Sequence, residues 1–375
     1  MRLLHIADLH AGKTLGRVSR NPDLHHALEQ VISLCRESGV DLLLIAGDVF
    51  DKANPDNESK ELIFEFFLKL RELKTEVVVV AGNHDSYDFM KSIRGLTELA
   101  NVHIYDRPSR ERCLYVSGDL RIACLPYPSE RVLTAVGEDS RLRYADLVEK
   151  FLSYLAEKAS EGRRRVLLTH LFIAGARYTN TEREASLTQH YAVLPASLPD
   201  TFDYIALGHV HRNQRIEGAS VCAWYSGTLY QLDFSEAGED KFVNLVLLED
   251  GPPRVEPVRL DLRNPLHVFE LTQGEAVRRI GEMKGVSGYI KIVLRVEEKG
   301  SLPLVVEKIR EELGEKILRI EQVSESGRSE SWDVPRGLDP LQLYREYHRI
   351  SYGGSLPRNI EKVFLELLSR AEEGV

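Results

Sequence analysis

The feature that most constrains the fold is a series of short apolar segments that recur along residues 1 to about 260. Several, such as Leu42–Ala46 and Val77–Ala81, are continuous hydrophobic runs, which is typical of strands buried on both faces of a sheet. The predicted strands are Leu3–Ala7, Asp41–Ala46, Glu76–Ala81, Leu120–Leu125, Arg165–Thr169, Phe202–Leu207, Cys222–Tyr225 and Phe242–Leu248. Helical patterns lie between them, at Leu24–Glu37, Glu58–Leu73 and Tyr144–Lys158. This alternation predicts an α/β fold built in layers.

The rest of the 375-residue chain divides into two smaller parts. After Asn264-Pro265, strand and helix patterns alternate over His267–Leu271, Glu275–Met283, Tyr289–Val296, Pro303–Leu313 and Ile317–Val323. A polar stretch, Ser324–Ser331, then leads to two short amphipathic helices, predicted at Pro340–Ile350 and Asn359–Ala371. We therefore predict a main domain over residues 1–263, a small α+β domain over 264–325, and a linker with a helix-loop-helix over 326–375.

Composition limits the environment and the mode of binding. The four cysteines are scattered without CxxC spacing, no signal peptide is recognisable, and no run approaches the ~18 apolar residues of a membrane span. We therefore expect a soluble, cytoplasmic protein with no membrane association. The 49 basic and 58 acidic residues give a net charge of −9, which argues against whole-surface nucleic-acid binding but leaves room for a local basic groove.

Acidic, amide and imidazole side chains follow five of the predicted strands. They lie in Asp8-Leu9-His10, Gly47-Asp48-Val49-Phe50-Asp51, Gly82-Asn83-His84-Asp85, His170 and Gly208-His209-Val210-His211. Sites in open α/β sheets form beyond the carboxyl ends of the strands, so these side chains are predicted to converge. The three glycines let the backbone turn sharply where a Cβ would obstruct it. One such histidine alone would more often be structural, but the ordered set favours a common site.

The chemistry of this set indicates metal ions. Mixed nitrogen and oxygen ligands suit Mn²⁺, Fe²⁺ or Zn²⁺. The set offers more ligands than one ion needs, and two ions about 3.5–4 Å apart that share a carboxylate would use them all. Such a pair is a common device for phosphoester hydrolysis. The pattern therefore predicts a two-metal phosphoesterase.

In this order, the motifs DLH, GDVFD, GNHD, H and GHVH resemble those of the calcineurin-like metallophosphoesterases. The longer stretches Arg2–His10, Ala46–Asp51, Ala81–Ser86 and Asp203–Arg212 resemble, more narrowly, the SbcD-type nuclease subunits of double-strand-break repair complexes. The resemblance implies a sandwich of two central sheets flanked by helices, a small capping domain that recognises DNA, and a C-terminal helix-loop-helix. It further implies a DNA exonuclease and endonuclease that processes DNA ends and hairpins in repair, recombination and replication.

The resemblance also assigns roles to the residues. It places one ion on Asp8, His10, Asp48 and His211, and a second on Asp48, Asn83, His170 and His209. It implies two Mn²⁺ ions, although ligand chemistry alone does not exclude Mg²⁺, Fe²⁺ or Zn²⁺. A hydroxide activated by the two metals would attack phosphorus, and His84 would assist the leaving oxygen as general acid or transition-state stabiliser.

Asp51 marks a departure within the wider family. Archaeal relatives carry a histidine three residues after the bridging aspartate, where this chain has Asp51. We expect the Asp51 carboxylate to orient His84 and to favour its protonated form. The alternative is that Asp51 or Asp85 only caps a turn.

Partners follow from the same resemblance. It implies an SMC-like ATPase of the SbcC type, bound through residues 338–371, and a homodimer formed by helices over 58–73 and 88–100. The pattern at Glu58–Leu73 is apolar around much of the helix, which favours a second burial partner, either another subunit or the Leu24–Glu37 helix. The basic residues near the motifs, which either contact DNA phosphates or are solvated, are Lys13, Arg17, Arg20, Arg177 and Arg212.

Two alternative functions stay open at this point. One is a phosphoesterase for a small molecule or a phosphoprotein, although the chain has GNHD where protein phosphatases have GNHE, and Lys52-Ala53 where they have Arg-Gly. The other is a scaffold that tethers DNA through a vestigial site. Retention of all seven predicted ligands and His84 argues against the scaffold. The chain has no sequence-reading motif, so any DNA recognition is expected to be of backbone and ends.

Overall fold

The computed structural model describes residues 1–129, 132–133, 144–179, 192–296 and 302–324, and isolated positions of the tail between 341 and 364. Residues 1–322 form one compact unit and residues 323–375 a second. The predicted tail helices therefore lie largely outside the described residues. Where they are described, the rings of Tyr344 and Phe364 stack with centroids 4.4 Å apart, and Arg345 forms an ion pair with Glu361.

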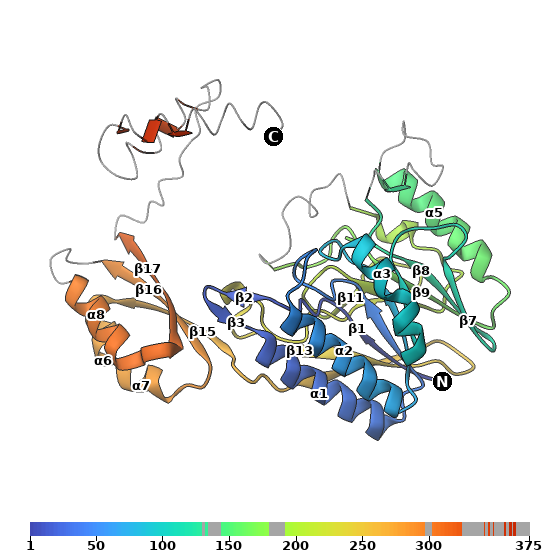
Figure 1. Cartoon of the computed structure of the whole chain (residues 1–375), viewed down its shortest axis with the longest axis horizontal. Coiled ribbons are helices and arrows are strands. Elements are labelled where there is room, and N and C mark those ends of the chain that lie inside the picture. Colours follow the sequence, from blue (N-terminus) through green and yellow to red (C-terminus); the bar gives the residue numbers. More distant parts are fainter. Residues whose placement is uncertain are drawn as a thin grey trace. The chain divides into compact units, whose positions relative to one another are not determined.

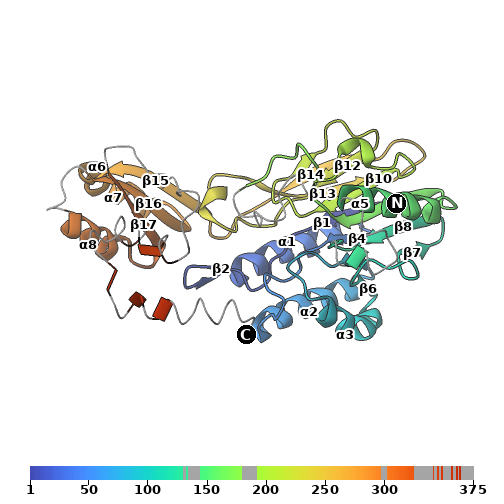
Figure 2. The same ribbon diagram turned by 90° about the horizontal axis from the view of Figure 1, so that it is seen from above.

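Two six-stranded sheets form the centre of the first unit (Figures 1 and 2). Their orders are β14-β13-β1-β4-β5-β6 and β11-β12-β10-β9-β8-β7. Parallel pairing joins β1, β4, β5 and β6 in the first sheet and β8, β9, β10 and β12 in the second. The strands are β1 (Arg2–Ile6), β4 (Leu42–Ala46), β5 (Glu76–Val80), β6 (Val102–Tyr105), β7 (Leu114–Ser117), β8 (Leu120–Leu125), β9 (Arg164–His170), β10 (Tyr204–Gly208), β11 (Gln214–Arg215), β12 (Cys222–Tyr225), β13 (Lys241–Leu247) and β14 (Arg254–Leu260).

Three hydrophobic clusters arrange these elements in layers. One fills the space between the sheets, where Leu44 and Val78 meet Leu168 and Ala206, all fully buried. Another joins the outer face of the first sheet to the helices α1 (Asn21–Ser38) and α2 (Asn57–Glu72), and the third joins the second sheet to α5 (Tyr144–Ala159). The helices thus flank the two sheets (Figure 1), which confirms the predicted layered α/β sandwich.

Local signals explain where the helices begin and end. Pro22 lies in the first turn of α1, and Gly39 ends the helix in the left-handed conformation. The side chain of Asp56 caps α2 by accepting the backbone N–H of Ser59 at 2.8 Å. The next helical elements are α3 (Tyr87–Thr97) and η1 (Glu98–Ala100). Shorter elements are a hairpin, β2 (Thr14–Leu15) with β3 (Val18–Ser19), and the turns η4 (Pro195–Ser197) and η5 (Phe234–Glu236).

The segment after Asn264 forms a three-stranded sheet with helices packed on one face. Its elements are β15 (Leu266–Thr272), α6 (Gln273–Arg278), α7 (Ile280–Gly285), β16 (Tyr289–Val296), α8 (Leu302–Leu313), η6 (Gly314–Lys316) and β17 (Ile317–Ser324). The single helix predicted over Glu275–Met283 is wrong, because Arg279 leaves the helical conformation with φ −94° and ψ 8° and separates α6 from α7. Among the described residues no helix is long and apolar enough to span a membrane. The four cysteines are free thiols.

Candidate metal centre

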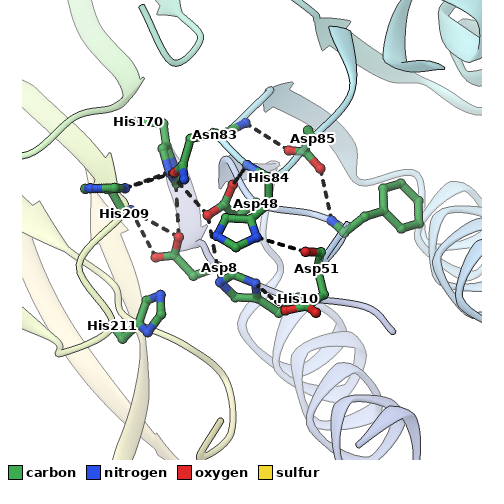
Figure 3. Close-up of polar contacts among 12 residues, drawn as sticks. Asp8, His10, Asp48, Asp51, Asn83, His84, Asp85, His170, His209 and His211 are labelled. Carbon is green, nitrogen blue, oxygen red and sulfur yellow. Dashed lines mark hydrogen bonds and ion pairs between the residues drawn. The ribbon is translucent and has the colours of Figure 1, made fainter. Parts of the chain in front are cut away.

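The side chains predicted as metal ligands lie together beyond the carboxyl ends of five strands (Figure 3). The first sheet supplies three strand ends, those of β1, β4 and β5, and the second sheet supplies those of β9 and β10. Most of these side chains are buried, with residue exposures of 3% or less at Asp8, His10, Asp48, His170, His209 and His211. The structure therefore brings all seven predicted ligands to one site between the two sheets.

The backbone at this site is strained. Only six non-glycine residues among those described have positive φ, and four of them are predicted ligands: Asp8 at 53°, His10 at 45°, Asp48 at 50° and His209 at 102°. The glycines of the motifs make the close approach possible. A Cβ on Gly208 would collide with the carbonyl oxygen of Ala46, and a Cβ on Gly82 would collide with the Asp48 carboxylate. Strain concentrated in this way is typical of a functional site.

Electron-pair donors face one another in the half of the site nearest to β9 and β10. The Asn83 Oδ1 atom lies 2.9 Å from His170 Nε2 and 3.0 Å from His209 Nδ1. The two ring nitrogens are 3.2 Å apart, and Asp48 Oδ2 is 3.4 Å from His170 Nε2. Nδ1 of His170 faces the carbonyl oxygen of Ala46 at 2.8 Å, so it holds a proton there and Nε2 is left with a lone pair in the neutral ring. A cation fits this arrangement, because it would bind lone pairs that otherwise repel.

The other half of the site contains Asp8, His10 and His211, whose ligand atoms lie within 4.8 Å of one another. His10 Nε2 is 3.8 Å from Asp48 Oδ2 and has no hydrogen-bond partner among the described residues. A buried nitrogen without a partner is costly in a folded protein, and a metal ion would satisfy it. Asp48 lies between the two halves and contacts ligands of both.

Glu236 lies beside His211 and pairs with Lys241. No sequence pattern predicted either residue as part of the site. Glu236 Oε1 lies 3.5 Å from His211 Nδ1, and Glu236 Oε2 lies 2.6 Å from Lys241 Nζ, with all three side chains buried. The carboxylate also accepts the backbone N–H of Leu232 at 3.1 Å. Lys241 outweighs the effect of burial and lowers the pKa of Glu236, so it is ionised. A proton on His211 Nδ1 would therefore face Glu236 and leave Nε2 for a metal.

The pKa shifts follow from burial and from the charges that face one another in the cluster. Burial raises the pKa of Asp8 to about 7. Burial opposes the charged form of His170, but the Asp48 carboxylate outweighs it and raises the pKa of this histidine to about 9. Burial works against Asp48 as well, yet His170 holds the pKa of Asp48 well below its usual range. The cluster thus takes up protons to balance its carboxylates, and divalent ions would perform the same task.

His84 is held differently from our expectation. Its Nδ1 donates to the backbone carbonyl oxygen of Asp51 at 2.8 Å, and its backbone N–H donates to Asp48 Oδ1 at 2.8 Å. The Asp51 carboxylate lies 3.3 Å from His10 Nδ1 (Figure 3). It also lies 3.3 Å from Lys13 Nζ. These contacts hold the pKa of Asp51 at about 2 against the effect of burial. Asp51 therefore orients His84 through its backbone, while its side chain supports His10.

Asp85, the possible turn cap, connects two of the loops that form the site. Its carboxylate accepts backbone N–H groups from Gly82 at 2.8 Å, Phe50 at 3.0 Å and Val49 at 3.2 Å. The loops after β4 and β5 are thereby fixed to each other. Burial, with the nearby Asp48, raises the pKa of Asp85 to about 6.

The prediction that the basic residues near the motifs contact DNA or are solvated is wrong for Arg20. It is 1% exposed, and its guanidinium donates to the carbonyl oxygens of Gln231 at 3.1 Å and Asn264 at 3.2 Å and lies 3.4 Å from Asp23. A buried guanidinium with these partners does not reach a DNA phosphate. Arg17, Arg177 and Arg212 are exposed, and Lys13 is partly exposed beside Asp51.

Comparisons with known proteins agree with this geometry. Residues 1–213 match the family described as calcineurin-like phosphoesterase. The chain is 29% identical over 389 aligned positions to SbcD, a subunit of the nuclease SbcCD, from Bacillus subtilis (strain 168), covering 100% of this chain and 99% of that relative. Among solved structures, a family 1 β-glucosidase from Thermotoga maritima aligns at 12% identity over 80% of this chain and 77% of its own, but the TM-score of 0.21 is too low to indicate a shared fold.

Proposed function

This chain belongs to the calcineurin-like phosphoesterase family, and from that membership we propose that it is a metal-dependent DNA nuclease with exonuclease and endonuclease activity. The observation that carries the proposal is the convergence of seven nitrogen and oxygen donors on one buried site. DNA as the substrate is supported by the Bacillus subtilis relative, which is by name part of a nuclease and aligns over nearly its whole length. A small molecule or a phosphoprotein is the second candidate substrate.

Two Mn²⁺ ions, bound as the resemblance implies, would polarise the phosphodiester and activate the attacking water. The side chain of His84 lies beside this site, since it offers a ligand atom within 4.8 Å of those of His10 and Asp48. Because its Nδ1 donates to a carbonyl oxygen, Nε2 is the nitrogen that gains and loses a proton. We assign to the His84 imidazolium the donation of that proton to the leaving oxygen as the bond to phosphorus breaks.

The test of the proposal compares three substrates in the presence of Mn²⁺: linear double-stranded DNA, bis(p-nitrophenyl) phosphate and p-nitrophenyl phosphate. A DNA nuclease is expected to cleave the DNA and the diester and to act poorly on the monoester. Cleavage of the monoester alone would indicate a phosphatase for small molecules or phosphoproteins. No cleavage of any substrate by a chain that binds Mn²⁺ would support the scaffold.

For the C-terminal tail we propose binding to an SbcC-type ATPase, with residues 264–325 forming a capping domain. The contacts of Tyr344 with Phe364 and of Arg345 with Glu361 support a paired arrangement of the two tail segments. Truncation after Ser324 should leave Mn²⁺-dependent nuclease activity intact and abolish co-purification with the ATPase. A truncated chain that still binds the ATPase would assign this contact to residues 1–324.

We further propose a homodimer through α2 and α3. Leu68 on α2 is 51% exposed, and Leu96 and Leu99 at the end of α3 and in η1 are each 72% exposed. Residues of α2 and η1 are in contact, so these leucines belong to neighbouring surfaces. Most other large apolar side chains of α2 are wholly or partly covered by the first domain. A monomeric mass by light scattering at micromolar concentration would contradict the dimer.

The cytoplasmic location stays a prediction.

A further inference from the structure

A cleft of about 900 Å³ is lined by segments that follow two of the predicted ligands. One wall is formed by residues 174–177 and the other by residues 212–219, which include β11. Each wall continues directly from a predicted ligand, the first from His170 through the segment after β9 and the second from His211. The cleft therefore lies along the two segments that follow the predicted ligands of the second sheet.

Hydrogen bonds of one side chain fasten the two walls to each other. Gln214 accepts the backbone N–H of Arg177 at 2.9 Å and donates to the carbonyl oxygen of Arg177 at 2.6 Å. The same amide lies 3.2 Å from the carbonyl oxygen of Arg212. The backbones of Arg177 and Arg212 are thus fixed relative to each other.

Three arginines, Arg177, Arg212 and Arg215, line the cleft, and all three are exposed. Among the described residues, the lining includes one carboxylate, that of Glu217. Within the part of the chain that the structure describes, none of the three guanidiniums forms an ion pair, whereas the exposed Arg163 pairs with Asp250 at 2.8 Å. The cleft thus carries an excess of positive charge beside a site that would hold a phosphodiester.

The lining also indicates which part of a nucleic acid would bind. Most of the other described lining residues are small, such as Ala174, Gly175 and Gly218, and none of them has an aromatic ring on which a base could stack. Guanidinium groups match the geometry of phosphate oxygens and bind them through paired hydrogen bonds. The combination favours contact with the sugar-phosphate backbone, which positions a strand without reading its sequence.

We propose that this arginine cleft binds backbone phosphates of the DNA strand on one side of the scissile bond, an assignment that rests on the proposed nuclease function. The flanking phosphates would hold the strand while the scissile phosphate lies at the metal centre. Such contacts contribute to DNA binding through charge and are therefore sensitive to salt.

The test uses the full chain with Arg212→Gln and Arg215→Gln combined, and Arg163→Gln as the matched control. DNA affinity is measured by fluorescence anisotropy at several salt concentrations in EDTA. Two lost phosphate contacts should reduce the slope of log K against log [salt] by about 2. With Mn²⁺ present, kcat/KM for DNA should fall by at least roughly tenfold more than kcat/KM for bis(p-nitrophenyl) phosphate, which has no flanking phosphates. The control should match the wild type.

An unchanged salt slope in the double variant would overturn the assignment of the cleft. An equal fall for DNA and for the small diester would overturn it too, because the arginines would then act on the metal centre. Failure of the nuclease proposal is visible separately, in a wild-type chain that cleaves the small diester but no DNA.

Discussion

Histidines connect the two sheets at two levels, and their surroundings differ. In the core, Nδ1 of His5 on β1 lies 2.8 Å from the hydroxyl of Tyr204 on β10, and both residues are fully buried. Burial lowers the pKa of His5 to about 3, so the ring is neutral. At the strand ends, His170 lies among carboxylates that raise its pKa to about 9.

Neighbouring charge distinguishes the histidine of the core from those at the strand ends. In the core, the Tyr204 hydroxyl pairs with Nδ1 of His5, Nε2 of His5 has no hydrogen-bond partner among the described residues, and no carboxylate acts on the ring. At the metal centre, His170 and His209 crowd around one oxygen of Asn83, and His170 also faces the carboxylates of Asp48 and Asp8. The core contact carries no charge, whereas the site at the strand ends gathers carboxylates that bound cations would balance.

The site at the strand ends should be the most sensitive to mutation. Asp48→Ala removes the carboxylate that contacts ligands in both halves of the site. We expect metal content to fall at both ion positions and nuclease activity to drop to background, measured by elemental analysis and by cleavage of linear DNA with Mn²⁺. Activity close to that of the wild type would exclude the two-metal site.

His84→Asn should lower kcat by roughly 10²–10⁴-fold, the range typical of a lost general acid. Bound metal and DNA affinity should be retained, because the residue is proposed to donate a proton and not to bind an ion. Elemental analysis next to single-turnover kinetics separates the two roles. If the variant loses a metal ion, His84 is a ligand.

Glu236→Gln tests the support behind His211. Loss of the charge next to His211 Nδ1 should weaken Mn²⁺ binding by roughly 10–100-fold, the effect typical of residues that orient a ligand. Calorimetric titration of the metal-free protein measures this without any turnover. The matched control is Glu239→Gln, because Glu239 lies 3.8 Å from Lys241 and is partly exposed. Equal affinity in both variants would show that Glu236 does not act on the metal site.

Tyr204→Phe removes the hydroxyl that contacts His5 in the core. It leaves a buried ring nitrogen of His5 without its partner, which should cost about 1–3 kcal/mol of unfolding free energy. Metal content should stay at the wild-type level. Chemical denaturation followed by circular dichroism gives the first quantity and elemental analysis the second. A loss of metal would mean that the core contact and the metal centre are coupled.

The smallest effect is a dependence on pH. Because the pKa of His170 is raised to about 9 in the folded chain, its proton stabilises the metal-free protein below pH 6.5, and this stabilisation is lost as pH rises through 9. A metal ion must displace that proton, so the rise in Tm caused by Mn²⁺ should be larger at pH 8.5 than at pH 6.5. His5, with its pKa near 3, stays neutral throughout and adds nothing to the change. A rise in Tm that is equal at both pH values would contradict this linkage.

Sequence reasoning predicted the features that follow local rules. Apolar runs predicted the central strands, and polar residues at their carboxyl ends predicted which side chains meet, because parallel strands bring these ends to one edge. Strand β14 was missed, since most of its residues are exposed and its sequence has no apolar run. Glu236 was missed because it follows no predicted strand. The burial of Arg20 and the backbone contact of Asp51 depend on distant parts of the chain, which no local pattern records.

The distribution of the ligands along the chain has a consequence for folding. Asp8 and His211 are separated by nearly the whole of the two-sheet domain, and His170 and His209 come from a different sheet from Asp48. No short segment can therefore assemble the site, and contacts between residues so distant in sequence form slowly because a long loop must close first. During synthesis, the centre cannot be completed before residue 211 has left the ribosome. Under the proposed function, the complete metal centre would therefore form late, once the two sheets have come together.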